Sequence, residues 1–468
     1  MFDRNIQKSK LNVGVAQVDI TPWADVNLAG AVGVRRRARA ILDPLFARAI
    51  VFDNGTRKLC LITGDLTIIT RKAGDTIRDM VARRFGFDRD AIIVHLTQTH
   101  TAPSLGNFML DQDFANIPEK YDWLRGGDSR YTEFAIEKFV EAIGLAVENL
   151  QPVEVGITSA LEGRLAFNRR GISKDGKVIM PPRKWADMRG CADILYLEGP
   201  MDPQVLMMCF QTVDLKIPAA ILHYSCHPVH VFPKQLISAD WPGAWCDGVR
   251  ELFGGECTPL VVNGCCGNLN PWDPWDPDYP DDHVRMGRIL TERCRDVLEF
   301  IKFSDSDTLS YRSVHFKIPY RQVPEDVLAE AKQYLAEHLD IVWKDDSHTS
   351  VDMEWYKRAM MVSIDLEQKR EGAMDYEIQV CRIGDIAMVA LPGEPFVEGQ
   401  LKIKLNSPAK YTFVMHMTSH YVGYIPTFEA MKRGGHETTL STWSKLVPQA
   451  LDMIVDTSID LLKEVFKK

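Results

Sequence analysis

Side chains able to bind a metal ion and to transfer protons recur at one kind of place in this sequence. His100, His227, Glu394, Tyr421 and Tyr424 each follow a short apolar run by a few residues. Neutral imidazole is a common zinc ligand, and carboxylate oxygens complete many such sites. A tyrosine hydroxyl can donate a proton or stabilise a developing oxyanion. Together these residue types favour a metal-dependent active site.

Each of these residues also has an ordinary structural interpretation. A single histidine after a strand is more often a hydrogen-bonded structural residue, although His100 and His227 both lie just before a proline in equivalent positions. Glu394 could accept hydrogen bonds from the first turn of a helix, or the preceding Pro-Gly turn could hold its carboxylate at a strand edge. Tyr421 and Tyr424 could simply pack in a core. The sequence leaves these alternatives open.

Six apolar runs lead into these side chains and into other polar clusters. Short apolar runs bounded by Gly and Pro are typical of buried strands. The expected strands are residues 58–63, 91–96, 219–224, 259–263, 385–390 and 411–417. In α/β folds, ligands bind beyond the carboxyl ends of such strands. We therefore expect the residues that follow the six runs to gather at one site.

Two loops and two aspartates add to this candidate site. Residues 264–271 (GCCGNLNP) form a Gly-rich turn whose backbone N–H groups could line an oxyanion site, but they lack the lysine of a P-loop. In the next loop, Trp272 and Trp275 beside carboxylates suit either a sugar-like substrate or a rigid surface loop. Asp65 and Asp240 also follow apolar runs, where an aspartate either orients a ligating histidine or stabilises a turn.

Strand-like segments alternate with amphipathic segments of helical period, which predicts an α/β fold. The expected helices are residues 75–85, 131–150, 282–300, 325–338, 353–369, 396–405 and 445–468. Residues 340–349 are polar and are predicted to form a loop.

Composition argues against several classes of partner. The net charge is −9, and the single basic cluster, residues 35–39, is short, so neither nucleic acid nor an anionic membrane is an expected partner. No stretch approaches the ~18 apolar residues of a membrane span, and the N-terminus lacks the apolar core of a signal peptide. Ten cysteines without a CxxC pair fit a reducing compartment. We expect a cytoplasmic protein that acts on a small molecule, and the sequence allows a homo-oligomer.

Ten short segments match the motifs of a single known family in order and spacing. They are residues 13–22, 45–53, 64–65, 97–103, 168–169, 199–203, 226–228, 236–240, 392–394 and 421–424. Residues 97–103 (TQTHTAP), for example, are similar to the family motif Thr-His-Thr-His-Ser-Gly-Pro. The sequence therefore resembles the catalytic domain of the neutral (non-lysosomal) ceramidase family over most of its length.

The resemblance implies a fold and a domain organisation. The family's catalytic domain has mixed β-sheets with outer helices, which here would form two α/β halves in an α/β/β/α sandwich. We expect one domain over residues 1–468, with lobes 10–302 and 308–468. The family also carries a C-terminal β-sandwich domain that has no counterpart in this sequence.

The resemblance also implies a zinc site. The family binds one Zn²⁺ with two His, one Glu and one Tyr, and the motifs carry His227, Glu394 and Tyr424 over as ligands. The first histidine of the family's double-His motif is Gln98 here, so either His100 takes its place, Gln98 coordinates weakly, or the affinity for the metal falls. Of these, we expect His100 as the remaining ligand or as an immediate neighbour of the metal.

A second departure concerns the nucleophile. The family motif Gly-Asp-Val-Ser-Pro corresponds to residues 267–271 (GNLNP), where Asn270 replaces the catalytic serine. Serine chemistry is excluded at this position, but the Asn270 amide could still donate a hydrogen bond to a substrate oxygen. Ceramide cleavage is therefore not carried over.

These observations predict a zinc-dependent hydrolase that cleaves an amide or related bond of a small polar substrate with metal-activated water. Arg169 would pair with an oxyanion or a substrate carboxylate, and His100 or Tyr421 would transfer protons. Residues expected to support the ligands or contact the substrate are Asp65, Gln98, Asp240, Asn268, Trp272 and Trp275. One alternative is a carbohydrate-active hydrolase that cleaves a glycoside or lactone. The other is a catalytically degenerate relative that only binds a ligand.

Overall fold

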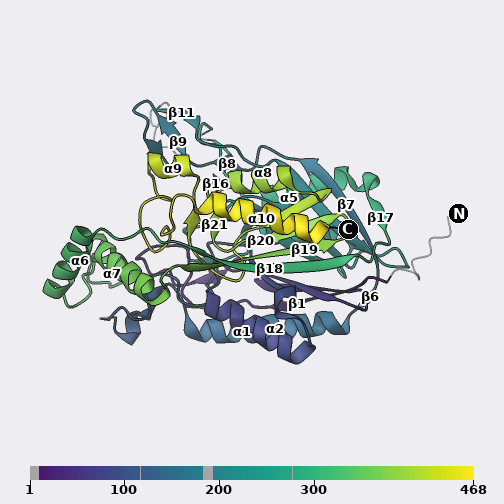
Figure 1. Cartoon of the computed structure of the whole chain (residues 1–468), viewed down its shortest axis with the longest axis horizontal. Helices are drawn as coiled ribbons and strands as arrows, with labels where there is room; N and C mark the ends of the chain where they lie inside the picture. The colour runs from purple at the N-terminus through teal and green to yellow at the C-terminus, as the bar shows by residue number, and fades with distance from the viewer. Residues whose placement is uncertain (1–9, 116, 183–192, 277, 468) are drawn as a thin grey trace.

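Three larger β-sheets with helices on their outer faces make up most of the molecule (Figure 1). The computed structural model describes residues 10–115, 117–182, 193–276 and 278–467. Within this part of the chain, the first sheet uses strands up to residue 152, the second uses strands between residues 154 and 304, and the third uses strands from residue 309 onward. The predicted mixed α/β class is confirmed.

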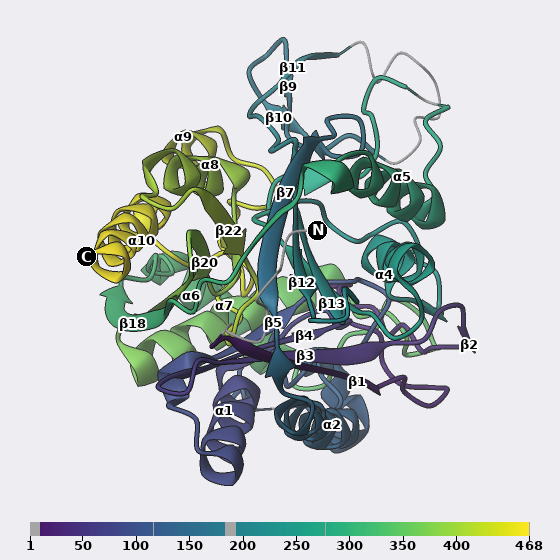
Figure 2. The same cartoon turned by 90° about the vertical axis from the view of Figure 1, so that its right-hand side faces the viewer.

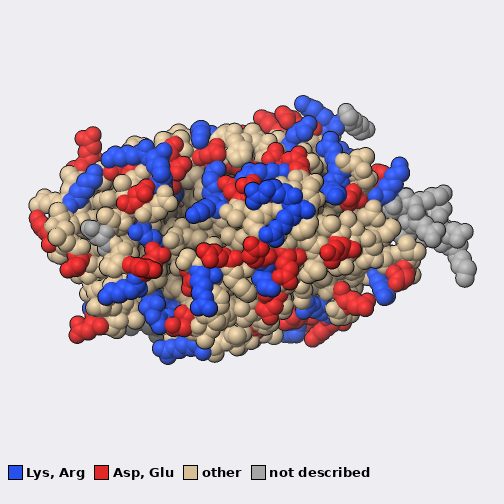
Figure 3. All heavy atoms as spheres, turned by 90° about the horizontal axis from the view of Figure 1, so that it is seen from below, with Lys and Arg blue, Asp and Glu red and all other residues tan. Residues whose placement is uncertain are grey.

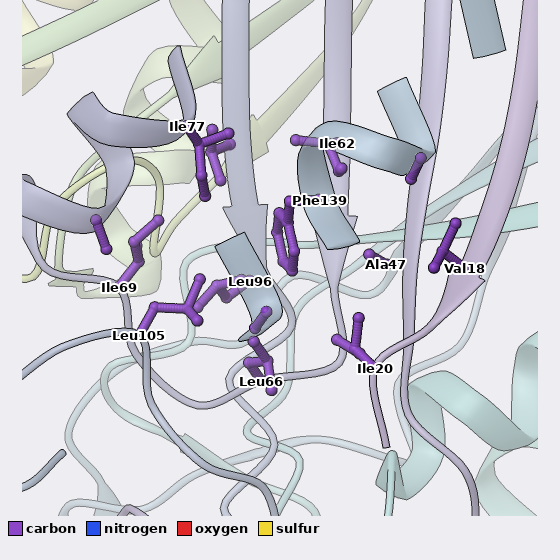
Figure 4. Packing of buried hydrophobic residues seen from close by; sticks show 14 of the residues in the cluster. Val18, Ile20, Ala47, Ile62, Leu66, Ile69, Ile77, Leu96, Leu105 and Phe139 are labelled. Atoms are coloured by element: carbon purple, nitrogen blue, oxygen red, sulfur yellow. The ribbon is translucent and has the colours of Figure 1, made fainter. Parts of the chain in front are cut away.

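The first sheet lies between two helices and the interior. Its strands, in order, are β5 (Ile92–Leu96), β4 (Lys58–Gly64), β3 (Phe46–Asp53), β1 (Asn12–Asp19) and β6 (Gln151–Pro152), with β4 and β5 parallel. The helices α1 (Arg71–Phe85) and α2 (Ser129–Glu148) cover its outer face. Ile62, Leu96 and Phe139 belong to the apolar cluster between this sheet and its helices (Figure 4).

The second sheet is backed by a different pair of helices. Its strands, in order, are β15 (Thr258–Asn263), β13 (Ala219–Tyr224), β12 (Gln204–Gln211), β7 (Glu154–Leu161) and β17 (Lys302–Ser304), with β13 and β15 parallel. The helices α4 (Asp240–Phe253) and α5 (His283–Asp296) pack on its outer face. A side chain at Gly248 of α4 would collide with Thr291 of α5, so this glycine permits the close approach of the two helices.

The third sheet completes the interior. Its strands, in order, are β18 (Leu309–Ile318), β19 (Met374–Ile383), β20 (Ile386–Ala390) and β22 (Tyr411–Met415), with β20 and β22 parallel. The helices α8 (Val397–Asn406) and α10 (Ala450–Phe466) cover its outer face. To one side, α6 (Glu325–Glu337) and α7 (Met353–Glu371) pack against each other.

The inner faces of all three sheets share one apolar core. Phe52 of β3, Phe210 of β12 and Phe413 of β22 are fully buried members of this cluster. Figure 2 shows the three sheets around it, with α1 and α2, α4 and α5, and α8 and α10 on the outside. The expected order of layers, helix–sheet–sheet–helix, therefore occurs twice. One stack contains the first and second sheets with their outer helices, and the other contains the first and third sheets with theirs.

Short strand pairs extend this framework beyond the main sheets. They are β2 (Ala40–Ile41) with β14 (Leu236–Ile237), β8 (Phe167–Asn168) with β16 (Leu269–Asn270), β21 (Glu394–Pro395) with β23 (Tyr424–Ile425), and β9 (Gly171–Ser173) with β10 (Val178–Ile179) and β11 (Ile194–Leu197). A short helix, α9 (Phe428–Arg433), follows β23. In the β21–β23 pair, Glu394 lies directly beside Tyr424.

The six strands predicted from apolar runs are all confirmed, to within a few residues at their ends. The seven predicted helices are confirmed as α1, α2, α5, α6, α7, α8 and α10, although α10 begins at residue 450 rather than 445. The sequence did not predict α4, because Pro242 and two glycines interrupt its helical pattern. Proline is tolerated in the first turn of a helix, where no N–H is needed. The lobes 10–302 and 308–468 would meet between β17 and β18, and this division stays a prediction.

The surface shows no broad region of one charge sign on the face seen from below, where basic and acidic side chains are interspersed (Figure 3). None of the helices in the described residues is long and apolar enough to cross a membrane.

A buried ion pair connects the first sheet's helix layer to the third sheet, which leads to a stability prediction. The Arg78 guanidinium of α1 donates to both carboxylate oxygens of Glu377 in β19, at 2.6 and 2.8 Å. Arg78→Met would leave the Glu377 carboxylate largely buried without its partner, so we expect the free energy of unfolding to fall by about 3–5 kcal/mol. Urea unfolding measures this. Arg83→Met, at an exposed position of the same helix, is the control, and equal losses in both variants would contradict the prediction.

Buried histidines lead to a prediction of pH-dependent stability. Burial lowers the pKa of His95 to about 3, and burial with the charge of Lys404 lowers that of His223 to about 4. Histidines of the unfolded chain titrate near pH 6.5, so the unfolded state takes up protons first as the pH falls. We expect unfolding free energy to be level above about pH 7.5 and to fall between about pH 6.5 and 4, by up to ~1.4 kcal/mol per pH unit for each ring. Urea midpoints that stay constant from pH 8 to 5 would refute it.

Candidate active site

A cavity of about 540 Å³ lies at the carboxyl ends of β5, β13, β15, β20 and β22. Residues that are far apart in the sequence line it together. Those expected from the sequence are Gln98, His100, Arg169, His227, Asn270, Trp272, Glu394, Tyr421 and Tyr424. The three sheets thus bring these nine side chains to one place.

Asn263, at the end of β15, fixes the loops that carry several of these residues. Its side-chain nitrogen donates to the carbonyl oxygens of Thr97 and Cys226, at 2.9 and 3.0 Å. Its side-chain oxygen accepts from the Cys226 N–H at 3.2 Å. Because Thr97 and Cys226 directly precede Gln98 and His227, one amide sets where both loops leave their strands.

His227 is held in a single tautomer. Its Nδ1 lies 2.6 Å from the carbonyl oxygen of Cys266 and 3.2 Å from that of Leu269, so this nitrogen carries the hydrogen. In the neutral ring Nε2 then bears a free electron pair, and it lies 3.2 Å from Glu394 Oε2. A backbone carbonyl that orients an imidazole in this way is a common feature of metal-binding histidines.

Glu394 is a buried, ionised carboxylate. Burial alone would raise its pKa, but its contacts with His227 and Gln98 and the charge of Arg169 lower the pKa to about 2. The Tyr421 hydroxyl donates to Oε1 at 3.1 Å. Among the described residues, no lysine or arginine forms an ion pair with Glu394, and the ring that pairs with it when protonated is that of His227.

The two tyrosines are protonated hydrogen-bond donors. Burial raises the pKa of Tyr421 and of Tyr424, and the neighbouring Glu394 raises both further. Tyr424 is fixed by the β21–β23 pair and by the donation of its N–H to the Trp443 carbonyl at 2.7 Å. Both hydroxyls can therefore donate to an oxygen that becomes negative at the site.

Arg169 is anchored by a glutamate that the sequence did not reveal. Its Nε donates to Glu437 Oε1 at 2.7 Å, and Arg170 donates to Glu437 Oε2 at 2.8 Å. Nη1 of Arg169 is 3.5 Å from Asn270 Oδ1, and its buried Nη2 has no hydrogen-bond partner in the described structure. Arg169 therefore offers the cavity a rigid, unpaired N–H group. Glu437 lies in a polar segment away from any strand end, so no sequence signal identifies it.

His100 and Gln98 lie on the side of the cavity that follows β5. The His100 ring packs edge-on against the rings of His227 and Phe232, with centroids 5.5 and 5.6 Å apart. Burial, with the neighbouring His227, lowers the pKa of His100 to about 3, so the ring is neutral and able to accept a proton or bind a metal. Gln98 adopts a left-handed backbone (φ 68°), and its Oε1 lies 2.8 Å from His416 Nε2.

The other predicted residues lie outside the cavity lining. Asp65 accepts from Arg48 and from the Phe46 N–H, and so closes the end of the first sheet. Asp240 accepts from the Val231 N–H at 3.0 Å, which fixes the loop after His227. Asn268 accepts from the Val397 N–H and donates to Glu398, and Trp275 is 43% exposed.

Two further residues at the cavity were not predicted. The ring of His436 stacks on Trp443 with centroids 5.4 Å apart and meets the edge of Tyr424 at 5.7 Å. Burial lowers the pKa of His436. Both residues follow β23, in a segment without an apolar run, so strand-end reasoning does not reach them.

The described residues contain no cluster of three or more His, Cys, Asp or Glu side chains able to hold a metal. His227 and Glu394 are adjacent, but any metal site here needs further donors of another type. The Tyr424 phenol lies beside Glu394 in the β21–β23 pair, and the ligand role that the resemblance implies for it stays a prediction.

No protein-family model matches the sequence. The fold is similar to those of solved ceramidases. The neutral ceramidase from Pseudomonas aeruginosa superposes with a TM-score of 0.70 at 16% identity, over 97% of this chain and 74% of that chain. A structure described as ceramidase complexed with C2 gives 0.69 at 16% identity, over 97% of this chain and 75% of that chain. At this identity the likeness shows the fold alone, and it confirms the ceramidase-like fold expected from the motifs.

Proposed function

We propose that this chain is a hydrolase that cleaves an amide or related carbon–nitrogen bond of a small molecule. The main support is the contact between Glu394 and His227. Nε2 of the imidazole and Oε2 of the buried carboxylate lie 3.2 Å apart. A nitrogen and an oxygen donor at this distance can share a proton or take up a cation, and either arrangement can activate water.

The donors at this point fit a divalent metal ion, with Zn²⁺ as the ion that the ceramidase-like motifs imply. His227, Glu394 and Tyr424 would hold it, with His100 as the remaining imidazole. Such an ion acts as a Lewis acid that polarises a carbonyl group and makes water a better nucleophile at neutral pH.

The surrounding side chains suit the hydrolysis of a carbonyl compound. The unpaired Nη2 of Arg169 and the Tyr424 hydroxyl would donate to the oxygen that becomes negative. Neutral His100, or Tyr421 through its bond to Glu394, would carry the proton from water to the leaving amine. Asn270 offers no nucleophile, so water attacks the substrate directly.

Glycoside cleavage is the weaker alternative. Trp272 and Trp443 line the cavity and would suit a sugar ring. Most glycoside hydrolases, however, use two carboxylates that flank the bond. Among the described lining residues Glu394 is the one acidic side chain, so this part of the lining does not offer the second carboxylate. A purely binding role is disfavoured because His227, Glu394, Tyr424 and Arg169 are present together in the cavity.

A cytoplasmic location is part of the proposal. The nine described cysteines are all free and buried, which fits a reducing compartment. Cys191 lies outside the described residues.

The first test of this function removes one proposed ligand. We expect His227→Ala to lose both bound metal and hydrolysis of a panel of N-acyl amines and N-acyl sugars, while its circular dichroism is unchanged. Elemental analysis and amine release measure the two losses. His338→Ala, at the end of α6, is the control. Full metal content in His227→Ala would refute the ligand assignment, and turnover of glycosides but not amides would favour the alternative.

The second test concerns Arg169. Arg169→Lys keeps the charge but removes the planar group that Glu437 aligns. We expect kcat for amide hydrolysis to fall about 10²–10³-fold with a smaller change in KM, as for the loss of one oxyanion donor. Arg164→Lys, at an exposed position, should retain the rate of the unaltered protein. A change confined to KM would instead assign Arg169 to substrate binding.

A further inference from the structure

The short basic cluster at residues 35–39 contains one arginine that is buried. Arg36 is 4% exposed, and its Nη2 donates to the carbonyl oxygens of Ala29 and of His100, the latter at 2.6 Å. Its Nε and Nη1 are buried and have no hydrogen-bond partner in the described structure. Because Nε carries one hydrogen and Nη1 carries two, more than half of the donors of this guanidinium are unpaired. Buried donors without partners are rare and require an explanation.

The charge of Arg36 also lacks a counter-ion. Burial lowers its pKa to about 10, so the side chain is still positively charged at neutral pH. Among the described residues no carboxylate forms an ion pair with it, and its remaining contact is the Phe232 ring, whose centroid lies 4.6 Å from the guanidinium carbon. An aromatic ring offsets only part of the cost of burying a cation. A buried positive charge without an anion therefore remains.

This guanidinium lies directly behind one wall of the cavity, where Gly30, His100 and Phe232 are lining residues. It donates to His100 and to Ala29, which precedes Gly30, and it lies over the Phe232 ring. A side-chain carbon at Gly30 would lie 2.5 Å from Nδ1 of His100, so the backbone packs directly on that ring. A single layer of residues therefore separates the Arg36 charge from the cavity.

The loop that carries Arg36 is fixed from two sides. Across the loop, the N–H of Leu28 donates to the Arg36 carbonyl oxygen at 2.8 Å. On the outer side, the N–H of Arg35 donates at 2.8 Å to the carbonyl oxygen of Thr349, in the segment between α6 and α7. The guanidinium is thus held in place before a ligand binds, which lowers the entropic cost of using it.

Apart from the proposed metal ion, the described lining residues have little free positive charge. They include no lysine, and the charge of Arg169 is balanced by Glu437, whose carboxylate lies 2.7 Å from it. Near Phe232 the lining is apolar and includes Val32 and Val229. A charge acts more strongly across such surroundings than it does in water. Arg36 is therefore the unbalanced charge of the chain that an anionic ligand would meet on this side.

We infer that the cavity prefers amides that carry a carboxylate, as N-acyl amino acids do, and that the unpaired charge of Arg36 selects them. This inference rests on the proposed hydrolase and specifies its substrate class. The carboxylate would lie beside Gly30 and Phe232, on the other side of the wall from the guanidinium, while Arg169 remains available for the oxyanion. Arg36 is thus a specificity-determining residue that acts through its charge.

Two pairs of compounds that differ by one carboxylate test this inference. N-acetylphenylalanine and N-acetylphenethylamine measure turnover as kcat/KM, and their methanesulfonyl counterparts, which an amidase does not cleave, measure dissociation constants by calorimetry. We expect the unaltered protein to prefer the acid of each pair about tenfold or more, and Arg36→Met to lose this preference. Arg36→Lys keeps the charge and should retain a preference. Arg39→Met, at an exposed position of the same cluster, should match the unaltered protein.

The ratio within each pair separates selection by charge from structural support. A structural role would weaken both members equally in Arg36→Met, and an unchanged ratio would overturn the inference while leaving the proposed hydrolase intact. No preference for the acid in the unaltered protein, or no binding of it, would also overturn the inference. A binding preference that depends on Arg36, without cleavage of either acetyl compound, would instead overturn the hydrolase. If Arg36→Met does not fold, Arg36→Gln can still donate to a carbonyl oxygen and must lose the same preference.

Discussion

The site depends on hydrogen bonds made by one buried amide, that of Asn263. Its side chain connects the ends of β5 and β13 through Thr97 and Cys226, while its main-chain N–H donates to His95 Nε2 at 3.1 Å. An aspartate of the same shape could not replace it, because two of these bonds need an N–H₂ group. The parallel strand pairs bring the loops close together, but this amide sets the depth at which Gln98 and His227 enter the cavity. The three-sheet architecture and the chemistry are thus coupled at a single residue.

Several arginines near the cavity are paired with buried glutamates. Arg169 and Arg170 share Glu437, and Arg170 also pairs with Glu198, which in turn pairs with Arg433. Glu394 is a buried carboxylate that faces His227 at 3.2 Å and would pair with that ring when it is protonated. A buried charge of this kind is costly unless a partner is supplied. The contact between these two side chains is therefore central to the charge balance of the cavity.

Much of this could be predicted from the sequence, for a physical reason. Buried parallel strands have continuous apolar runs, so their carboxyl ends, and hence His227, Glu394 and Tyr424, are visible as a pattern. Residues that act through tertiary contacts leave no such pattern. Glu437 and His436 lie in loops after β23. The helix α4 is hidden by Pro242, Gly243 and Gly248, of which Gly248 permits the close packing against α5. Asp65 follows β4 in the predicted way. Its carboxylate, however, pairs with Arg48 of β3, the antiparallel neighbour of β4.

The ceramidase motif that this chain resembles has a serine at the position of Asn270, and this difference constrains the proposed reaction more than the difference at position 98 does. A serine hydroxyl can attack the substrate and become acylated, and water then hydrolyses the acyl-enzyme in a second displacement. The carboxamide of an asparagine is not a nucleophile of this kind. Asn270 instead places its oxygen 3.5 Å from Nη1 of Arg169 and helps to hold the guanidinium. In the proposed hydrolase, the residue at the position of the family's serine would therefore support the arginine proposed to stabilise the oxyanion. If the chain is a hydrolase, it must cleave its substrate in one displacement by water, and no acyl-enzyme should accumulate before the steady state.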